Sequence, residues 1–252
     1  MPHTSFMRFT ATFLLSILSS QVGYAADFMV QVVVRGGERF EGQPLYHSPD
    51  LAQMMLRDGQ LFEFRPADVV SIRKSASSFR SYSDSQMRSR LAGEFGNRFE
   101  VTGTGSYLVV HSRGKKDLWA QRFEDLHRDF VHYFTVRGFK IHEPDFPLIG
   151  VVWPSKEEFR RQAARSGAQI GENVVGYYSP VTNRVHLYDA MRDEHDRSGW
   201  QQTASTIIHE VTHQTAFNTG IHTRFAGTPM WVVEGLGTLF EARSDRGSAR
   251  QT

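Results

Sequence analysis

The stretch TASTIIHEVTHQTAFNTGIHTRFAGTPMWVVEGLGTLFE, residues 203–241, carries the strongest chemical pattern in this chain. Within it, His209 and His213 stand four residues apart in the sequence HEVTH, and Glu210 follows the first of them. Side chains four residues apart lie one turn above each other on one face of a helix, so both imidazoles can bind one metal ion. Glu210 projects from a neighbouring part of that face, from which a carboxylate reaches a water on the metal without binding the metal itself. This spacing predicts the site of a zinc hydrolase.

The flanking residues predict that the motif lies in the middle of a helix. Ile207, Ile208 and Val211 give the segment an apolar side, and the hydroxyl residues within 203–206 are typical of a helix start. Asn218-Thr219-Gly220 then ends the pattern with a glycine, which readily adopts the left-handed conformation of a helix end. This context favours a metal helix over a chance match among the 11 histidines of the chain.

Two histidines bind zinc weakly, so the pattern requires a third ligand. One candidate, His222, lies just past the break at Gly220 and would fold back only through a tight turn. The other, Glu234, lies in WVVEGLG, residues 231–237, which is typical of the first turns of a second helix after Pro229. Its distance from the motif allows one loop and a return to the first helix. We therefore favour Glu234 and keep His222 as the alternative.

Together, HEVTH and WVVEG resemble the zinc-binding motifs of the gluzincin metallopeptidases, the thermolysin-like and peptidase MA group. A longer stretch, from about residue 90 to residue 241, is similar to an uncharacterised bacterial family with a peptidase-MA-like domain. The segments that carry this likeness are HEPDFPLIGVVWPSKEEF, GYYSPVTNRVHLYD and HQTAFNTGIHTRF. These motifs are specific for a metal site and a fold, and they say little about the substrate.

The resemblance implies an α+β fold with a zincin-like metallopeptidase domain, in which active-site helices pack on a mixed sheet. It implies that His209, His213 and Glu234 bind Zn²⁺ and that Glu210 is the catalytic general base. In gluzincins an edge strand before the metal helix binds the substrate backbone as an added strand. The resemblance assigns this role to Arg184–Tyr188.

Composition excludes several other classes of protein. Lys and Arg number 29 against 27 Asp and Glu, so no basic excess indicates a nucleic-acid partner. The chain has no cysteine, which excludes disulfides and lipoprotein attachment. A length of 252 residues suffices for one medium domain with a small appendage.

We expect the chain to divide into five segments. Residues 1–25 are typical of a secretory signal peptide, because Arg8 precedes an apolar run too short to span a membrane and small residues precede Ala26. This predicts a secreted or periplasmic protein with no stable membrane span. The remaining segments are a small β-barrel-like domain at 26–74, a Ser-rich linker at 75–86, the zincin-like metallopeptidase domain at 87–245 and a polar tail at 246–252.

Residue patterns also predict the main elements of both domains. In the small domain, β-rich runs at 28–34, 39–46, 60–66 and 69–74 predict strands, with breaks at Gly42, Asp58-Gly59 and Pro66. In the larger domain we expect a helix at 87–95, a hairpin at 98–112, a helix with an aromatic stripe from Trp119, a buried strand at 147–153 and a hairpin at 176–189.

The main hypothesis is a secreted zinc-dependent peptidase that acts on peptides or proteins. One alternative is a metal-binding but catalytically weak protein that binds peptide or cell-wall material, and another is a zinc hydrolase of a different amide or ester. An intact Glu210 favours an enzyme. Because the sequence ends 18 residues after Glu234, three alternatives stay open: a shallow, open cleft, a cleft completed by a partner, and a truncated product.

Two roles in such a site stay open at this point. The candidates for a donor to the oxyanion are Tyr177, Tyr178, His222 and Arg224. The candidates for a hydrogen-bond acceptor that orients the ligand histidines are Asn218, Thr238 and Glu241.

Overall fold

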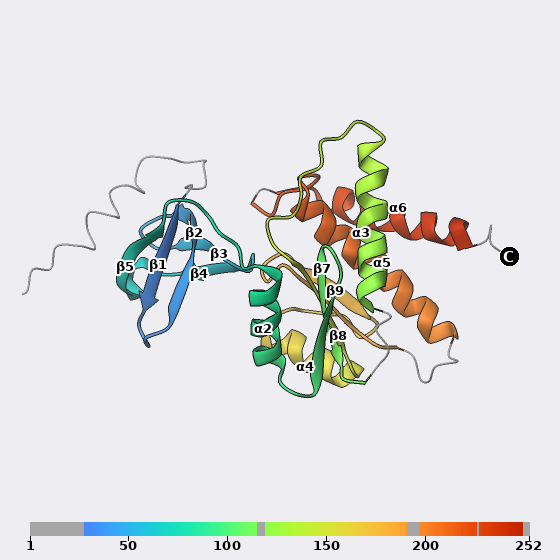
Figure 1. Cartoon of the computed structure of the whole chain (residues 1–252), viewed down its shortest axis with the longest axis horizontal. Coiled ribbons are helices and arrows are strands. Elements are labelled where there is room, and N and C mark those ends of the chain that lie inside the picture. The colour runs from blue at the N-terminus through green and yellow to red at the C-terminus, as the bar shows by residue number, and fades with distance from the viewer. Residues whose placement is uncertain (1–27, 115–118, 191–196, 226, 249–252) are drawn as a thin grey trace, which may run out of the picture. The chain divides into compact units, whose positions relative to one another are not determined.

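The computed structural model describes residues 28–114, 119–190, 197–225 and 227–248. The chain forms two compact units, Met1–Tyr82 and Ser83–Thr252, and it is a mixed α+β protein with one sheet in each unit (Figure 1). The boundary between the units falls inside residues 75–86, the segment predicted as a linker. The expected signal peptide, residues 1–25, lies outside the described residues.

The first unit is built on an antiparallel sheet with the strand order β4-β3-β2-β1-β5. The strands are β1 (Met29–Val34), β2 (Arg39–His47), β3 (Ala52–Leu56), β4 (Leu61–Phe64) and β5 (Val69–Ala76), with a 3-10 turn at Pro66–Asp68. Alternate valines of β1 pack with Met54 to form the core of this unit. The described residues of the unit are thus all-β, as predicted, and closure into a barrel stays a prediction.

Two details of this sheet differ from the prediction. Residues 52–56, AQMML, form β3, which the sequence pattern does not indicate because neither alanine nor methionine is β-branched or aromatic. Gly42, expected as a break, lies inside β2 opposite Leu56. A Cβ atom at Gly42 would lie 2.1 Å from the backbone oxygen of Met55, so the glycine permits close approach of β2 and β3.

The second unit contains a mixed sheet with the strand order β6-β7-β8-β10-β9. Its strands are β6 (Phe99–Gly103), β7 (Tyr107–Ser112), β8 (Leu148–Trp153), β9 (Gly176–Ser179) and β10 (Arg184–Tyr188). The pairs β6–β7 and β9–β10 are antiparallel and form the two predicted hairpins. β8 runs parallel to both β7 and β10, and every residue in it is buried, as its continuous apolar run predicts.

One expectation for this sheet is wrong, because Arg184–Tyr188 is not an edge strand. β10 pairs with β8 on one side and with β9 on the other. The strand at that edge of the sheet is therefore β9, Gly176–Ser179. The parallel pairing of β10 with β8 joins residues far apart in the chain, and a hairpin pattern alone does not show which of its two strands will make that contact.

Among the described residues there are five α-helices, labelled α2 to α6 in Figure 1. They are α2 (Asp84–Phe95), α3 (Trp119–Thr135), α4 (Lys156–Arg165), α5 (Arg197–Asn218) and α6 (Met230–Ser248). The aromatic stripe of α3 is buried, as predicted, with Phe123 and Phe130 almost fully removed from solvent. Phe123 belongs to the same buried cluster as Ile207 of α5 and strand residues such as Val185, so α3 and α5 share one core with the sheet.

A second apolar cluster holds α6 against α3 and α5. It contains Phe130 of α3, Ile208 of α5 and Phe240 of α6. The rings of Phe130 and Phe240 stack with centroids 5.1 Å apart. Full burial of a side chain of this size contributes about 1.5–3 kcal/mol, so a few such contacts suffice to fix the position of α6 on α5.

Three helix ends differ from the prediction. α2 begins at Asp84 because Ser83 and Gln86 form a capping box ahead of it. α5 begins at Arg197, so the hydroxyl residues within 203–206 lie inside the helix and not at its start. α6 continues to Ser248, so part of the expected polar tail is helical.

None of the helices in the described part of the chain combines the length and the apolar character that a membrane crossing needs.

Candidate metal centre

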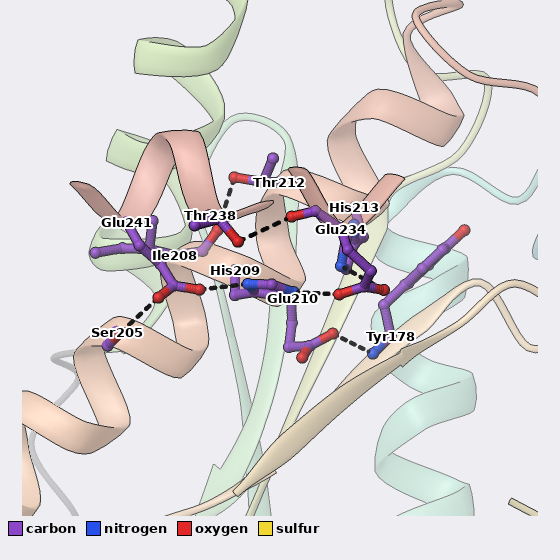
Figure 2. Close-up of polar contacts among 10 residues, drawn as sticks. All are labelled: Tyr178, Ser205, Ile208, His209, Glu210, Thr212, His213, Glu234, Thr238 and Glu241. Carbon is purple, nitrogen blue, oxygen red and sulfur yellow. Dashed lines mark hydrogen bonds and ion pairs between the residues drawn. The ribbon is translucent and has the colours of Figure 1, made fainter. Parts of the chain in front are cut away.

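His209 and His213 of α5 face Glu234 of α6 (Figure 2). The Nε2 atom of His209 is 3.1 Å from one carboxylate oxygen of Glu234, and the Nε2 atom of His213 is 3.7 Å from the other. The centroids of the two imidazole rings are 4.5 Å apart. One ligand atom from each of the three residues lies within 4.8 Å of the other two. The structure therefore brings together the three residues that the sequence pattern predicts as metal ligands.

His222, the alternative third ligand, is not part of this group. Gly220 ends α5 with a φ of 86°, and the backbone N–H of His222 then donates to the Ala216 carbonyl. The imidazole of His222 packs beside Phe217, with ring centroids 5.4 Å apart. The tight turn after Gly220 thus caps the helix and does not return His222 to the histidine pair.

The three donor groups fit a zinc ion. Zinc sites in proteins use imidazole nitrogens and carboxylate oxygens, and a set of three protein ligands leaves a further position for water or substrate. Burial and the neighbouring His209 lower the pKa of His213 to about 4, so its imidazole is neutral at pH 7 and has a lone pair for a metal. The Glu234 side chain is 52% exposed, so the group opens toward solvent on the side of α6.

Gly237 permits the close approach of α6 to His209. A Cβ atom at this position would lie only 2.7 to 2.9 Å from three atoms of the His209 ring. Any larger residue would therefore turn the ring or push α6 away from α5. The sequence pattern places Gly237 inside WVVEGLG without a role, because an isolated helical glycine ordinarily just weakens a helix. Its role becomes visible only when the two helices pack.

Glu241 lies two turns after Glu234 on α6 and forms a hydrogen bond with Nδ1 of His209 (Figure 2). Because an ionised carboxylate only accepts hydrogen bonds, Nδ1 carries a proton, and Nε2, which lies 3.1 Å from Glu234, is the nitrogen that can bind a metal ion in place of a second proton. The Ser205 hydroxyl donates to the other oxygen of Glu241 at 3.4 Å. Glu241, one of the candidates for supporting the histidines, thus forms a hydrogen bond with one of them. Thr238 instead donates to the backbone oxygen of Glu234 at 3.0 Å.

Glu210 lies between α5 and the edge strand β9. Its carboxylate accepts a hydrogen bond of 2.7 Å from the backbone N–H of Tyr178 in β9 (Figure 2). Burial raises the pKa of Glu210 to about 7, although His209 and the Tyr178 N–H both favour its ionised form. The structure therefore places a carboxyl group with a raised pKa next to His209, the first candidate ligand.

Paired amide side chains fasten the β9–β10 hairpin to the end of α5. Asn183, in the hairpin turn with a φ of 57°, exchanges two hydrogen bonds of 2.8 and 2.9 Å with Asn218. The Tyr178 hydroxyl also donates to Asn183, at 2.9 Å, and Gln214 donates to the Asn183 backbone oxygen at 2.7 Å. These bonds hold β9 at a fixed place beside α5. Asn218, one of the candidates for supporting the histidines, thus contacts the hairpin turn.

A cavity of about 380 Å³ adjoins the candidate ligands. His213 and Glu234 line it together with Tyr178 and Arg224. The Nη1 group of Arg224 donates to the Pro180 carbonyl at 3.1 Å, which ties the guanidinium to the end of β9. Two of the four candidate oxyanion donors therefore lie in the cavity beside the ligands.

The other two candidates lie elsewhere. Tyr177 stacks on His186, with ring centroids 5.2 Å apart, and His222 lines a neighbouring, larger cavity. Of the two candidates that line the smaller cavity, Tyr178 already donates its one hydroxyl proton to Asn183, whereas the Arg224 guanidinium carries further N–H groups besides the one that donates to Pro180.

Comparison with known proteins relates the site helices to one family. Residues 203–252 match a family described as "Protein of unknown function (DUF1570)". The match begins inside α5, before the HEVTH motif, and includes α6 with Glu234, but it does not reach the sheet. No curated protein matches the chain.

Proposed function

We propose that this protein is a zinc-dependent peptidase of the gluzincin type, with a zincin-like fold in its second unit. The observation that carries the proposal is the convergence of His209, His213 and Glu234 at one point, with Glu210 held between that point and an edge strand. A metal-binding site alone would not need a buried carboxyl group beside its ligands.

Zinc bound by these three residues would supply a Lewis acid that polarises a carbonyl group and lowers the pKa of a water to about 7. The residues of the chain prepare for it in two ways. The low pKa of His213 keeps that imidazole neutral, and the hydrogen bond to Glu241 selects the tautomer of His209 that offers Nε2.

Glu210 would serve as the general base and then as the general acid. A proton-transfer group works best when its pKa lies near the working pH, and the pKa of Glu210 is raised to about 7 by burial. Such a group can take a proton from water and return it to the leaving amine within one catalytic cycle. The N–H of Tyr178 orients its carboxylate while this happens.

The substrate would lie along β9 as an added strand. Tyr178 is opposite Val185 in the antiparallel pair, yet its N–H donates to Glu210 and so points away from β10. The backbone of this edge strand therefore faces the metal site, where an extended peptide can pair with it. The role that the resemblance assigns to Arg184–Tyr188 passes to Gly176–Ser179. Arg224, tied to the end of β9, would stabilise the negative charge that develops on the attacked carbonyl oxygen.

The proposal includes export after cleavage of residues 1–25, which the signal-like composition of that segment supports. Mass spectrometry of the exported protein tests it directly. A mature N-terminus at Ala26 is the expected result, and an intact Met1 terminus on membrane-bound material would contradict export as a soluble protein.

The decisive experiment is cleavage of a broad peptide library by the zinc-loaded protein, with and without a chelator, and by Glu210→Gln. The substitution preserves size and removes the basic carboxylate. We expect cleavage by wild type to require the metal. Glu210→Gln should contain as much zinc as wild type, but its rate of cleavage should be lower by at least the roughly 10²–10⁴-fold that general acid–base catalysis contributes. Full zinc loading of wild type without cleavage of any peptide would disprove the peptidase and leave a metal-binding protein.

A further inference from the structure

A large apolar cavity lies beside the proposed catalytic site. Its volume is about 1020 Å³, and its walls come from the end of α5, the connection to α6, one face of α6, Phe134 of α3 and residues of the segment 142–145. Trp231 and Leu239 of α6 line it together with Phe225 of the connection, and the exposed fractions of these residues are 77%, 41% and 56%. Clustered apolar side chains at this degree of exposure indicate a binding surface.

The sequence of α6 separates this surface from the metal site. Trp231, Gly235 and Leu239 follow one another at intervals of four residues, so they lie on one face of the helix. Glu234 and Glu241 lie seven residues apart on another face, which turns to His209. One helix therefore carries a face for the metal and a face for a second, apolar contact.

The cavity adjoins the pocket at the metal ligands. Four residues line both of them: Phe217, Thr223, Arg224 and Thr228. A chain bound at the metal would therefore reach the larger cavity by passing Arg224. The larger cavity is lined by two acidic residues, Glu143 and Asp145, and by the basic Arg224, so its charged side chains are of both signs. An extended peptide with an apolar side chain fits a path that leads from the metal ligands past Arg224 to the exposed apolar residues of α6.

We infer that this cavity is the specificity pocket of the enzyme and binds a bulky apolar side chain, such as phenylalanine, of a peptide whose backbone lies at the metal. The inference rests on the proposed peptidase function. It names the substrate class: polypeptides long enough to reach from the metal ligands past Arg224, with an apolar residue on that side of the cleaved bond.

The test uses pairs of ten-residue peptides that differ by phenylalanine or glycine at one position, scanned through the sequence. For the zinc-loaded wild type we expect a higher kcat/KM for phenylalanine at one position on one side of the cleaved bond. Trp231→Ala and Leu239→Ala should lower kcat/KM about tenfold for the phenylalanine peptide and change it little for the glycine peptide. Val136→Ala, which removes an exposed apolar side chain outside both cavities, should change neither. An undiminished preference for phenylalanine in both cavity variants would overturn the inference.

A measurement of peptide affinity distinguishes a failure of this inference from a failure of the proposed function. In zinc-loaded Glu210→Gln, calorimetry measures the affinity for the phenylalanine peptide without cleavage. Adding Trp231→Ala should weaken this affinity about tenfold. If wild type cleaves nothing but this loss of affinity is seen, the peptidase proposal fails and the apolar peptide site stands. If the phenylalanine and glycine peptides bind Glu210→Gln equally, or neither binds, the inference about the cavity fails, whatever the activity of the wild type.

Discussion

Glu241 forms a hydrogen bond with the Nδ1 atom of His209, and the opposite side of the same ring faces Glu234. Both carboxylates come from α6, and the ring comes from α5. Burial by itself would lower the pKa of His209, but the charges of Glu210 and Glu241 and the hydrogen bonds of the ring outweigh it, so that its pKa is raised. A metal ion at Nε2 would take the place of the second proton that these carboxylates attract.

Removal of any one ligand should abolish tight metal binding. We expect about one zinc ion per chain in wild type and a strong loss of zinc in His209→Ala, His213→Ala and Glu234→Gln, because two remaining donors do not complete the site. Elemental analysis after dialysis against a weak chelator measures this. His222→Ala is the matched control and should retain its zinc. The reverse pattern, with full zinc in Glu234→Gln and loss in His222→Ala, would show that His222 is the third ligand.

Removal of the Glu241 carboxylate, which forms a hydrogen bond with His209, should weaken metal binding without abolishing it. Glu241→Gln retains size but loses the charge that fixes the Nδ1 proton, so zinc affinity should fall about 10–100-fold. Competition with a fluorescent chelator gives the affinity. Thr238→Val on the same helix is the control, because its hydroxyl donates to the Glu234 backbone and contacts neither histidine in the described contacts. Equal affinities of Glu241→Gln and wild type would remove Glu241 from the metal centre.

Two glycines of α6 should respond in opposite ways to alanine. Gly237→Ala places a methyl group against the His209 ring, so we expect weaker zinc binding and a lower thermal midpoint. Gly235→Ala meets nothing within 4 Å and should stabilise the helix by about 0.5–1 kcal/mol with zinc affinity unchanged. Thermal unfolding with and without zinc measures both. If Gly237→Ala matches Gly235→Ala in both measurements, the close packing of α6 on His209 is not needed for stability or for zinc binding.

Stability should fall in acid partly because of His186. This residue is buried in β10, its Nδ1 accepts from the Trp153 indole at 3.4 Å, and burial followed by the charge of Arg184 lowers its pKa to about 3. The folded state keeps it neutral, whereas the unfolded chain protonates it near the ordinary histidine pKa of 6.5. Its contribution is therefore complete above about pH 6.5 and is lost, by up to about 1.4 kcal/mol per pH unit, as the pH falls toward 3.

Urea unfolding of the zinc-free protein between pH 7 and pH 4 tests this. His186→Gln cannot take up that proton, so its free energy of unfolding should decline less steeply with falling pH than that of wild type. Parallel slopes for the two proteins would show that His186 is protonated equally in the folded and unfolded states.

Several parts of this structure follow from local sequence. The buried strand β8 and the aromatic face of α3 follow from apolar runs and helical spacing. Gly220 marks the end of α5 because glycine adopts a positive φ without strain, and Pro229 stands immediately before α6 because the fixed φ of proline suits a helix start. The helix starts are less well predicted. The hydroxyl residues near Thr203 resemble caps, but α5 begins six residues earlier, at Arg197, because a hydroxyl side chain is also tolerated inside a helix.

The sequence by itself determined that His209 and His213 lie on one face of a helix with Glu210 beside them, since residues four apart in a helix lie one turn above each other. It also pointed to Glu234, because a second helix after one loop is the shortest route back to the first. Only the tertiary structure decided that β9 and not β10 is the edge strand, that Glu241 supports His209 and that Gly237 lets the ring fit. These are contacts between elements. Periodicity shows which side of an element is apolar, but the partner against which that side packs depends on the path of the whole chain.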